Sequence, residues 1–171
     1  MKKLLKMKCK KIKLVLTDVD GVLTDGGRYF SEKGEIIKRF HVRDGMGINI
    51  LLRNEIQTAI ITKENSKIVK KWAKEMNVSK TYSGIKNKEK ELEKICKYYK
   101  VLPSEIAFIG DDVNDIKLMK KIGFSATPFD GILQAKKVAN YICKTSGGNG
   151  ALREIIDLIL EEKFSNKTNL Y

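Results

Sequence analysis

The sequence predicts an α/β fold in which a central parallel sheet lies between two layers of helices, a Rossmann-like α/β/α arrangement. Short, continuous apolar runs at 12–17, 58–62 and 106–110 are typical of strands that are buried on both faces. Segments with helical periodicity separate these runs. With 171 residues and only two prolines, the chain is expected to form a single domain over residues 1–171.

Further elements are expected around this sheet. Residues 28–40 contain two β-rich arms around Lys33 and Gly34, which predicts a small β-hairpin insertion within 26–40. Asp44 is expected to be the N-cap of a helix over 44–54. The remaining predicted elements are helices over 65–77, 86–100, 114–122 and about 150–162, a short strand over 124–127, and another short strand between Lys63 and Lys88.

The charge of the chain limits the partners that are expected. The formal net charge is +13, yet the lysines are spread along the whole chain and no segment interleaves arginines with aromatic residues. We therefore expect no nucleic-acid partner, and an anionic small substrate fits the charge equally well. The basic segment 1–11 lacks the apolar core of a signal peptide and is expected to be a frayed lead-in to the first strand.

The apolar runs and the cysteines bear on localisation. No run approaches the roughly 20 apolar residues of a membrane-spanning helix, so no membrane partner is expected. Cys9, Cys96 and Cys143 are odd in number and lack the spacing of metal ligands, which is typical of reduced thiols. The protein is accordingly expected to be cytoplasmic.

Polar side chains follow the predicted strands at their carboxyl ends, which is the edge where parallel sheets bind ligands. Carboxylates that converge there repel one another unless a divalent cation lies among them, and oxygen ligands suit Mg²⁺. A threonine hydroxyl and a lysine ammonium supply the donor and the positive charge that bind a phosphoryl group. The side chains concerned are Asp18, Asp20, Thr62, Lys88, Asp111 and Asp112.

Asp18 and Asp20 can divide the chemistry of phosphoryl transfer, because residues two apart in an extended chain project to the same side. One carboxylate can attack phosphorus and form an aspartyl-phosphate. The other can protonate the leaving alkoxide and later deprotonate the attacking water. Gly21 lets the chain turn sharply beside them.

Four motifs, in this order, resemble those of the haloacid dehalogenase superfamily of phosphotransferases. DVDGVLTD at 18–25 is similar to its first motif, Thr62 in IIT to its second, Lys88 in GIKNK to its third, and FIGDDVND at 108–115 to its fourth. With VRDGMGI and SGGNGALRE, these motifs resemble in particular the phosphatases of 3-deoxy-manno-octulosonate 8-phosphate and of sialic-acid-type 9-phosphates. The resemblance covers most of the chain and implies a Mg²⁺-dependent phosphatase of a 2-keto-3-deoxy sugar acid phosphate.

The resemblance also implies roles for individual residues. Asp18 would be the nucleophile, and Asp20 the general acid and base. Mg²⁺ would be held by the Asp18 carboxylate, the Asp20 main-chain carbonyl and Asp111. The other implied residues are Asp112 and Asp115 behind the metal ligands, and Thr62 and Lys88 at the phosphate.

Larger members of the superfamily insert a cap domain over the site, but the gaps 25–57 and 63–88 are too short for one. The resembling phosphatases instead form tetramers in which the hairpin and the C-terminal tail reach neighbouring subunits, which implies a homotetramer. Segment 145–171 would then be a tail and helix that closes over the substrate, with Arg153 near its carboxylate, and truncation after Lys144 would leave the fold intact. A flexible hinge at SGGNG is the alternative.

The residues after Thr62 bear on the choice of substrate. The octulosonate phosphatases usually have T-G-R here, whereas this chain has Lys63 and Glu64. A glutamate at this place resembles the nine-carbon enzymes and implies a substrate contact, although it could also be a first-turn helix charge. Lys63 departs from both groups, Asn149 replaces a frequent arginine, and Trp72, where relatives commonly carry arginine, is interpreted as core.

Two side chains and two other function classes complete the sequence-based expectations. Arg43 is either a substrate contact or the partner of a surface carboxylate, and the single histidine, His41, is expected to be structural. A signalling receiver domain phosphorylated on aspartate conflicts with the order Asp-x-Asp, Thr, Lys, Asp-Asp. A non-catalytic or regulatory domain of the same fold would not need an intact set of four site residues, namely Asp18, Asp20, Lys88 and Asp111.

Overall fold

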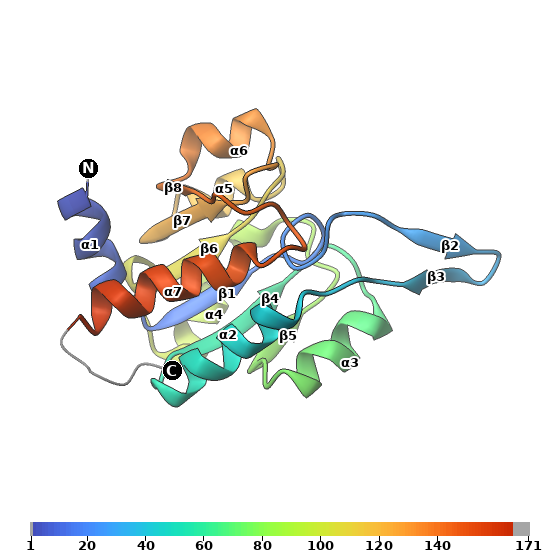
Figure 1. Ribbon diagram of the computed structural model, residues 1–171, viewed down its shortest axis with the longest axis horizontal. Coiled ribbons are helices and arrows are strands. Elements are labelled where there is room, and N and C mark those ends of the chain that lie inside the picture. Colours follow the sequence, from blue (N-terminus) through green and yellow to red (C-terminus); the bar gives the residue numbers. More distant parts are fainter. Residues whose placement is uncertain (1, 166–171) are drawn as a thin grey trace.

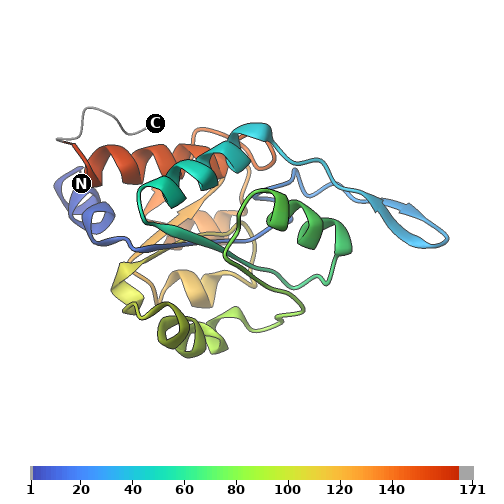
Figure 2. The same ribbon diagram turned by 90° about the horizontal axis from the view of Figure 1, so that it is seen from below.

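The computed structural model describes residues 2–165 and shows a six-stranded, fully parallel sheet between two layers of helices (Figure 1 and Figure 2). The strand order is β5-β4-β1-β6-β7-β8, so β1 and β6 are neighbours at the centre. The predicted three-layer fold is confirmed. The strands are β1 (Leu14–Thr17), β4 (Gln57–Ile61), β5 (Lys80–Tyr82), β6 (Ile106–Ile109), β7 (Phe124–Thr127) and β8 (Tyr141–Ile142).

The core consists of one apolar layer on each face of the sheet, because successive side chains of a strand point to opposite faces. In β1, Val15 packs in one layer, whereas Leu14 and Leu16 pack in the other. The strand is therefore buried on both faces, as its continuous apolar sequence predicts. Helices α1 (Lys2–Lys11), α2 (Val42–Arg53), α3 (Lys67–Glu75) and α7 (Ala151–Lys163) cover the first layer, and α4 (Leu92–Tyr99), α5 (Ile116–Met119) and α6 (Leu133–Val138) cover the second.

A β-hairpin projects from the body of the molecule between β1 and α2 (Figure 1). It consists of β2 (Tyr29–Ser31) and β3 (Gly34–Ile37), which pair antiparallel within the predicted range 26–40. Four of its apolar side chains are more than half exposed, namely those of Tyr29, Phe30, Ile36 and Ile37. The hairpin and α2 are the only elements between β1 and β4, so this stretch contains no cap domain.

The N-terminal basic segment is helical, so the expectation of a frayed lead-in is wrong for residues 2–11. Leu5, Cys9 and Ile12 recur at helical spacing and pack against the apolar layer beside α7. Cys9 and Ile12 are fully buried. The many lysines of the segment, together with the exposed Leu4 and Met7, hide this narrow apolar stripe in its composition.

Several helix boundaries differ from the prediction. The N-cap of α2 is His41 rather than Asp44, because His41 Nδ1 accepts a hydrogen bond from the backbone N–H of Arg43 at 3.3 Å. His41 is thus structural, as expected. The predicted helix 86–100 is divided into a 3₁₀ turn and α4. The 3₁₀ turn that precedes α4 is Lys88–Lys90. Three other short elements have no signal in the sequence, namely the 3₁₀ turn Pro103–Glu105, α6 and β8.

Helix α7 forms part of the core. It packs along α1 and α2, and its buried side chains are Leu152, Ile155, Ile156, Ile159 and Leu160. Truncation after Lys144 would remove this helix and expose both partners, so the expectation that the truncated chain keeps its fold is wrong. The last part of the predicted tail, 166–171, lies outside the described residues.

Candidate active site

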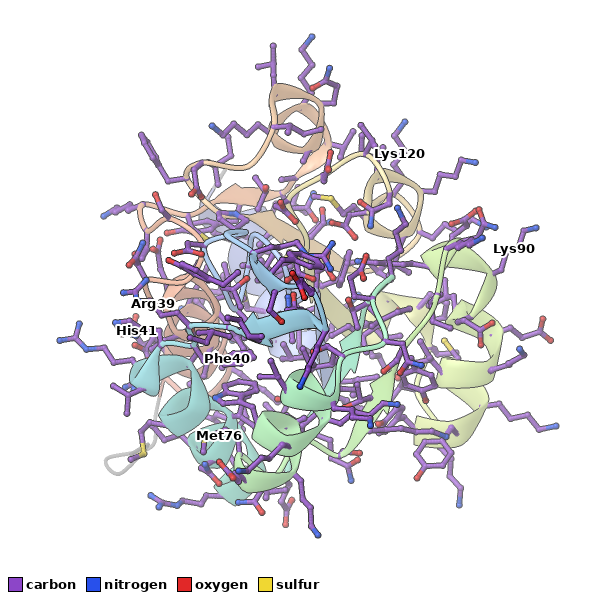
Figure 3. All side chains as sticks on the ribbon, turned by 90° about the vertical axis from the view of Figure 1, so that its right-hand side faces the viewer. Arg39, Phe40, His41, Met76, Lys90 and Lys120 are labelled. Atoms are coloured by element: carbon purple, nitrogen blue, oxygen red, sulfur yellow. The ribbon has the colours of Figure 1, made fainter. Side chains whose placement is uncertain are left out.

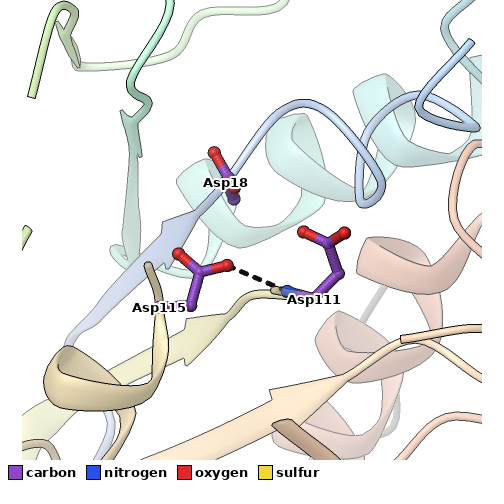
Figure 4. Close-up of side chains that lie close together, drawn as sticks. All are labelled: Asp18, Asp111 and Asp115. Carbon is purple, nitrogen blue, oxygen red and sulfur yellow. Dashed lines mark hydrogen bonds between the residues drawn. The ribbon is translucent and has the colours of Figure 1, made fainter. Parts of the chain in front are cut away.

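Three carboxylates converge beyond the carboxyl ends of β1 and β6 (Figure 4). Asp18 follows β1, Asp111 follows β6, and Asp115 lies in the turn that leads into α5. One oxygen of each lies within 4.8 Å of the others. The parallel pairing of β1 with β6 fixes this convergence, and the N–H of Asp18 extends the ladder by donating to Ile109 O at 3.0 Å.

The charges of this cluster repel one another. Burial raises the pKa of the Asp18 carboxyl to about 7, against the opposing effect of Lys88. Burial, followed by the charges of Asp18 and Asp115, raises the pKa of Asp111 to about 8. Asp111 Oδ1 is buried and has no hydrogen-bond partner among residues 2–165. A divalent cation would satisfy this oxygen and remove the repulsion, so the residues present fit the predicted Mg²⁺.

Lys88 is the cation of the cluster, and its side chain is fully buried. Its ammonium forms ion pairs with Asp18 Oδ2 at 2.8 Å and with Asp115 Oδ1 at 2.6 Å. Burial by itself lowers the pKa of Lys88, but the two carboxylates outweigh this effect and hold the pKa above its ordinary value. Lys88 therefore stays charged and fixes the orientation of Asp18.

Asp115 organises the loop that follows β6. Its Oδ2 accepts hydrogen bonds from the backbone N–H groups of Asp111 at 2.9 Å and of Asp112 at 3.3 Å, while Oδ1 is bound by Lys88. Both oxygens are thus engaged, which is consistent with the implied position of Asp115 behind the metal ligands. Asp112 is exposed, and its Oδ1 accepts a hydrogen bond from the N–H of Val113 at 2.6 Å.

A pocket of about 220 Å³ lies at this edge of the sheet. Thr62 follows β4 on one side of it, and the Thr62 hydroxyl oxygen accepts a hydrogen bond from the N–H of Glu64 at 3.3 Å. Lys88 does not line the pocket but reaches Asp18 from within the core. The structure thus brings together six predicted residues in the pocket wall, namely Asp18, Asp20, Thr62, Glu64, Asp111 and Asp112.

Two glycines allow backbone segments to approach closely beside the pocket. Gly21 has a φ of +85°, and a Cβ at this position would overlap Asp111 Oδ2. A Cβ on Gly147 would overlap the carbonyl of Gly21, and the Gly148 N–H donates to Val22 O at 2.9 Å. The SGGNG segment is therefore packed against the loop after β1, and the flexible-hinge interpretation is wrong.

Arg43 and Arg153 do not line the acidic pocket. They line a separate hollow of about 560 Å³ beside α7, together with Asn149. Arg153 Nε donates to Asp157 Oδ1 at 2.7 Å. Within one chain, the structure does not bring these arginines to Asp18. The sequence resemblance implies that Arg153 meets the same substrate as Asp18, and a substrate contact is one of the two interpretations of Arg43.

Lys38 and Glu35, from the second arm of the hairpin, are site residues that the sequence does not reveal. The fully buried side chain of Lys38 forms ion pairs with Asp20 Oδ1 and with Glu35 Oε1, the latter at 2.8 Å. Burial by itself lowers the pKa of Lys38, but hydrogen bonds to Asp20 and Glu35 hold it above its ordinary value. The only available signal is one lysine after two isoleucines in the hairpin arm, and nothing links it to Asp20 before the chain folds.

The connection from the hairpin into α2 packs on helix α3. Figure 3 views the molecule from the hairpin end and labels Arg39, Phe40 and His41 on this connection. Phe40 stacks on Trp72 of α3, with ring centroids 4.4 Å apart and an interplanar angle of 9°. Trp72 is partly buried against the core layer, so its interpretation as a core residue is confirmed.

The parallel sheet and its acidic edge define the class of the protein. The family model of the haloacid dehalogenase-like hydrolases matches residues 46–155, more than half of the chain, and the chain belongs to this family. The relatives of this chain are phosphatases, and the protein is therefore a phosphatase enzyme. The two alternatives, a signalling receiver domain and a non-catalytic domain, are wrong. None of the described helices is long and apolar enough to cross a membrane.

The similar proteins include octulosonate phosphatases. The 3-deoxy-D-manno-octulosonate 8-phosphate phosphatase KdsC of Escherichia coli (strain K12) is 37% identical over 153 residues, which cover 90% of this chain and 81% of that protein. A cobalt-bound structure of the Haemophilus influenzae phosphatase matches with a TM-score of 0.89 at 36% identity and covers 91% of both chains. The Moraxella catarrhalis phosphatase, solved with magnesium, phosphate and KDO, matches with a TM-score of 0.90 at 38% identity and covers 93% of this chain and 91% of that chain.

Proposed function

We propose that this protein is a Mg²⁺-dependent phosphatase that hydrolyses a 2-keto-3-deoxy sugar acid phosphate through an aspartyl-phosphate intermediate. The observation that carries the proposal is the convergence of Asp18, Asp111 and Lys88 at one edge of the sheet. The buried Lys88 pairs with Asp18 Oδ2 there, and Asp111 Oδ1 has no hydrogen-bond partner among the described residues. The relatives named above support the substrate class, and one of them was solved with magnesium, phosphate and KDO.

Asp18 and Asp20 carry the chemistry in this proposal. An Asp18 carboxylate oxygen attacks phosphorus while the bond from phosphorus to the sugar oxygen breaks, and Asp20 donates a proton to the departing oxygen. Asp20 then takes a proton from water as the water oxygen attacks phosphorus and the bond to Asp18 breaks. Inorganic phosphate is released, and Asp18 and Asp20 return to their starting forms. Thr62 and Lys88 bind the phosphoryl oxygens, because phosphoryl transfer depends mainly on positioning and charge compensation.

The carboxylates of Asp18 and Asp111, with the main-chain carbonyl of Asp20, would hold Mg²⁺. The bound metal supplies positive charge that offsets the repulsion between an anionic nucleophile and an anionic substrate. Lys88 and Asp115 position these ligands, since Lys88 binds Asp18 Oδ2 and Asp115 holds the backbone of Asp111.

The eight-carbon octulosonate 8-phosphate is the substrate that we favour, because the relatives that act on it cover nearly the whole chain. Glu64 supports a second candidate, a sialic-acid-type 9-phosphate. Glu64 lines the pocket, and its carboxylate pairs with Arg28 Nη2 of the hairpin connection at 3.5 Å. This pair lies beside the phosphate-binding Thr62, where it could contact the sugar chain.

The proposal includes a homotetramer. The hairpin exposes four apolar side chains, Tyr29, Phe30, Ile36 and Ile37, and a second copy that packs on the hairpin would bury apolar area there. Arg43 and Arg153 would reach a substrate only across a subunit interface, because they line a hollow separate from the acidic pocket. Light scattering should give the mass of four chains, and a fully active monomer would contradict this part of the proposal.

The deciding experiment compares kcat/KM on octulosonate 8-phosphate and on sialic-acid-type 9-phosphates, with Mg²⁺ and after chelation. We expect activity only with Mg²⁺ and a higher kcat/KM on the eight-carbon substrate. Asp18→Asn should be inactive on both, whereas Glu75→Gln, which changes an exposed carboxylate at the end of α3, should keep full activity. A wild-type protein that releases no phosphate from any of these substrates would rule out the proposal.

A further inference from the structure

A chain of polar contacts runs from helix α3 through the hairpin to Asp20. Ser66, at the N-cap of α3, donates its hydroxyl to Glu35 Oε2 at 3.1 Å. Glu35 Oε1 pairs with the ammonium of Lys38 at 2.8 Å, and the same ammonium pairs with Asp20 Oδ1. The second hairpin arm is therefore tied to α3 on one side and to the loop after β1 on the other.

Exposure differs along this chain of contacts. The side chain of Lys38 is fully buried, whereas 25% of the Asp20 side chain is exposed. Asp20 lines the pocket and Lys38 does not, so the ammonium contacts Asp20 from the protein interior. Without the contact to Asp20, the buried ammonium would keep only Glu35 and lose part of its charge compensation, which is costly. The contact between Lys38 and Asp20 is therefore persistent.

Two other interpretations of Lys38 agree less well with these contacts. A phosphate-binding lysine would lie at the nucleophile Asp18, as Lys88 does, whereas Lys38 pairs with Asp20 and Glu35. An ion pair that only anchors the hairpin would not need Asp20, because Glu35 is already held by Ser66 and by Arg28 Nε at 3.4 Å. Neither interpretation therefore explains the contact between Lys38 and Asp20.

We propose that Lys38, held in place by Glu35, is a positioning residue that orients the Asp20 carboxyl for proton transfer. The inference rests on the proposed function, in which Asp20 protonates the departing oxygen. Lys38 occupies Oδ1, so the transferred proton is carried on Oδ2, which makes no hydrogen bond with any described residue. A side chain with one fixed oxygen presents the other in a constant direction, and general-acid catalysis depends on this geometry.

The dependence of the rate on the leaving group tests whether Lys38 positions Asp20 as a general acid. A 4-nitrophenolate ion departs readily without a proton, whereas a phenolate ion is more basic and gains more from a positioned acid. Loss of the orientation of Asp20 should therefore slow phenyl phosphate more than 4-nitrophenyl phosphate. The ratio kcat/KM contains only the steps up to departure of the leaving group, so it excludes the second half of the reaction, in which Asp20 activates water.

The experiment compares wild type and Lys38→Met on these two esters with Mg²⁺. We expect kcat/KM to fall about 10- to 100-fold on phenyl phosphate and less than about 3-fold on 4-nitrophenyl phosphate, since a positioned general acid contributes roughly 10²- to 10⁴-fold. Lys33→Met, in the exposed turn of the same hairpin, is the matched control and should change neither value. Equal losses on the two esters would overturn the proposal, because a structural or substrate-binding lysine does not distinguish leaving groups.

Glu35→Gln is the second variant, since it keeps Lys38 and removes only the charge that holds Lys38 from behind. We expect a smaller loss with the same dependence on the leaving group, and this result decides the question if Lys38→Met does not fold. Equal losses in Glu35→Gln would also reject the role of Lys38. A wild-type protein that hydrolyses neither these esters nor the sugar acid phosphates would instead reject the proposed function itself.

Discussion

Asp44 of helix α2 caps helix α7 from the side, because its Oδ1 accepts a hydrogen bond from the backbone N–H of Arg153 at 2.8 Å. The first N–H groups of a helix have no partner within the helix, and Gly150, at the N-cap of α7, offers no side chain to bind them. Asp44 is fully buried, and its Oδ2 has no hydrogen-bond partner in the described part of the chain. Helices α2 and α7 are thus joined through one buried carboxylate.

This arrangement predicts a pH dependence of stability. Burial raises the pKa of Asp44 to about 7, against the opposing hydrogen bond and charge of Arg153. Because the folded pKa lies above the unfolded value, the stabilising contribution is complete below about pH 4 and is lost as the pH rises through 7. Asp44→Asn keeps an acceptor for the Arg153 N–H and cannot ionise. Between pH 5 and pH 8, its free energy of unfolding should therefore rise relative to wild type by about 2–3 kcal/mol.

Urea titrations of both proteins at several pH values measure this difference. In Asp44→Asn, the side-chain atom in the position of Oδ2 also lacks a hydrogen-bond partner, and the resulting loss of stability does not depend on pH. This loss shifts the whole curve of unfolding free energy against pH for Asp44→Asn without changing its slope. Asp18 and Asp111 titrate in both proteins, so their contributions cancel. Curves that stay parallel from pH 5 to pH 8 would contradict the assignment to Asp44.

Gly21→Ala should abolish activity for a local reason. The new Cβ would overlap Asp111 Oδ2, in addition to the strain of a side chain at φ +85°. Gly34→Ala is a matched control, since Gly34 also has a positive φ, of +105°, but a Cβ there meets nothing within 4 Å. Both variants should lose about 1 kcal/mol of stability from strain, yet only Gly21→Ala should lose phosphatase activity. Equal activities in an assay of phosphate release would show that the Asp111 position is not critical.

Binding of Mg²⁺ should stabilise the folded protein. At a concentration 100 times its Kd, the metal adds about 2.7 kcal/mol, which corresponds to a rise in Tm of roughly 5 to 10 °C for a chain of this size. Asp111→Asn should abolish this rise, while Glu75→Gln should retain it. Thermal scans with Mg²⁺ and with a chelator give the comparison, and an unchanged shift in Asp111→Asn would place the metal elsewhere.

Helix α7 should contribute to global stability through its buried face. Ile156→Ala removes a fully buried side chain at the contact with α2 and should cost about 2–5 kcal/mol, whereas Leu158→Ala, at a partly buried position of the same helix, should cost less. Denaturant unfolding measures both values. Similar small losses would mean that α7 is dispensable for the core, as the sequence alone suggests.

The sheet was predictable because its strands are short, continuous apolar runs. Such a pattern can be recognised without knowing which strands pair with each other. Strand 124–127 is found with the predicted boundaries, and the central strands differ from prediction by one or two residues at an end. Helix α1 and the cap of α2 were not predictable in the same way. The apolar stripe of α1 is recognisable as a buried face only when α7 packs against it. Asp44 is a plausible local N-cap of α2, but it instead accepts a hydrogen bond from α7, more than 100 residues away in the chain.

The acidic residues of the candidate site were predictable for a similar reason. Parallel strands place their carboxyl ends at one edge of the sheet. Asp18 and Asp111 follow β1 and β6, which are neighbours at the centre of the sheet, so these two residues lie near each other. The position of Arg153 was not predictable, because it depends on the packing of α7 and not on its spacing from any motif. The same holds for Lys38, which reaches Asp20 only because the second arm of the hairpin leads back to the loop after β1.

The amino-acid sequence by itself determined the layered fold and the carboxylates at its edge, since local periodicity and strand-end chemistry do not depend on distant contacts. Tertiary structure alone decided which side chains surround those carboxylates. Lys38 behind Asp20, Asp44 beside the start of α7 and Gly147 against Gly21 all depend on contacts between different elements of the fold. Such pairings follow from how helices and the hairpin pack on the sheet, and packing is a property of the whole folded chain.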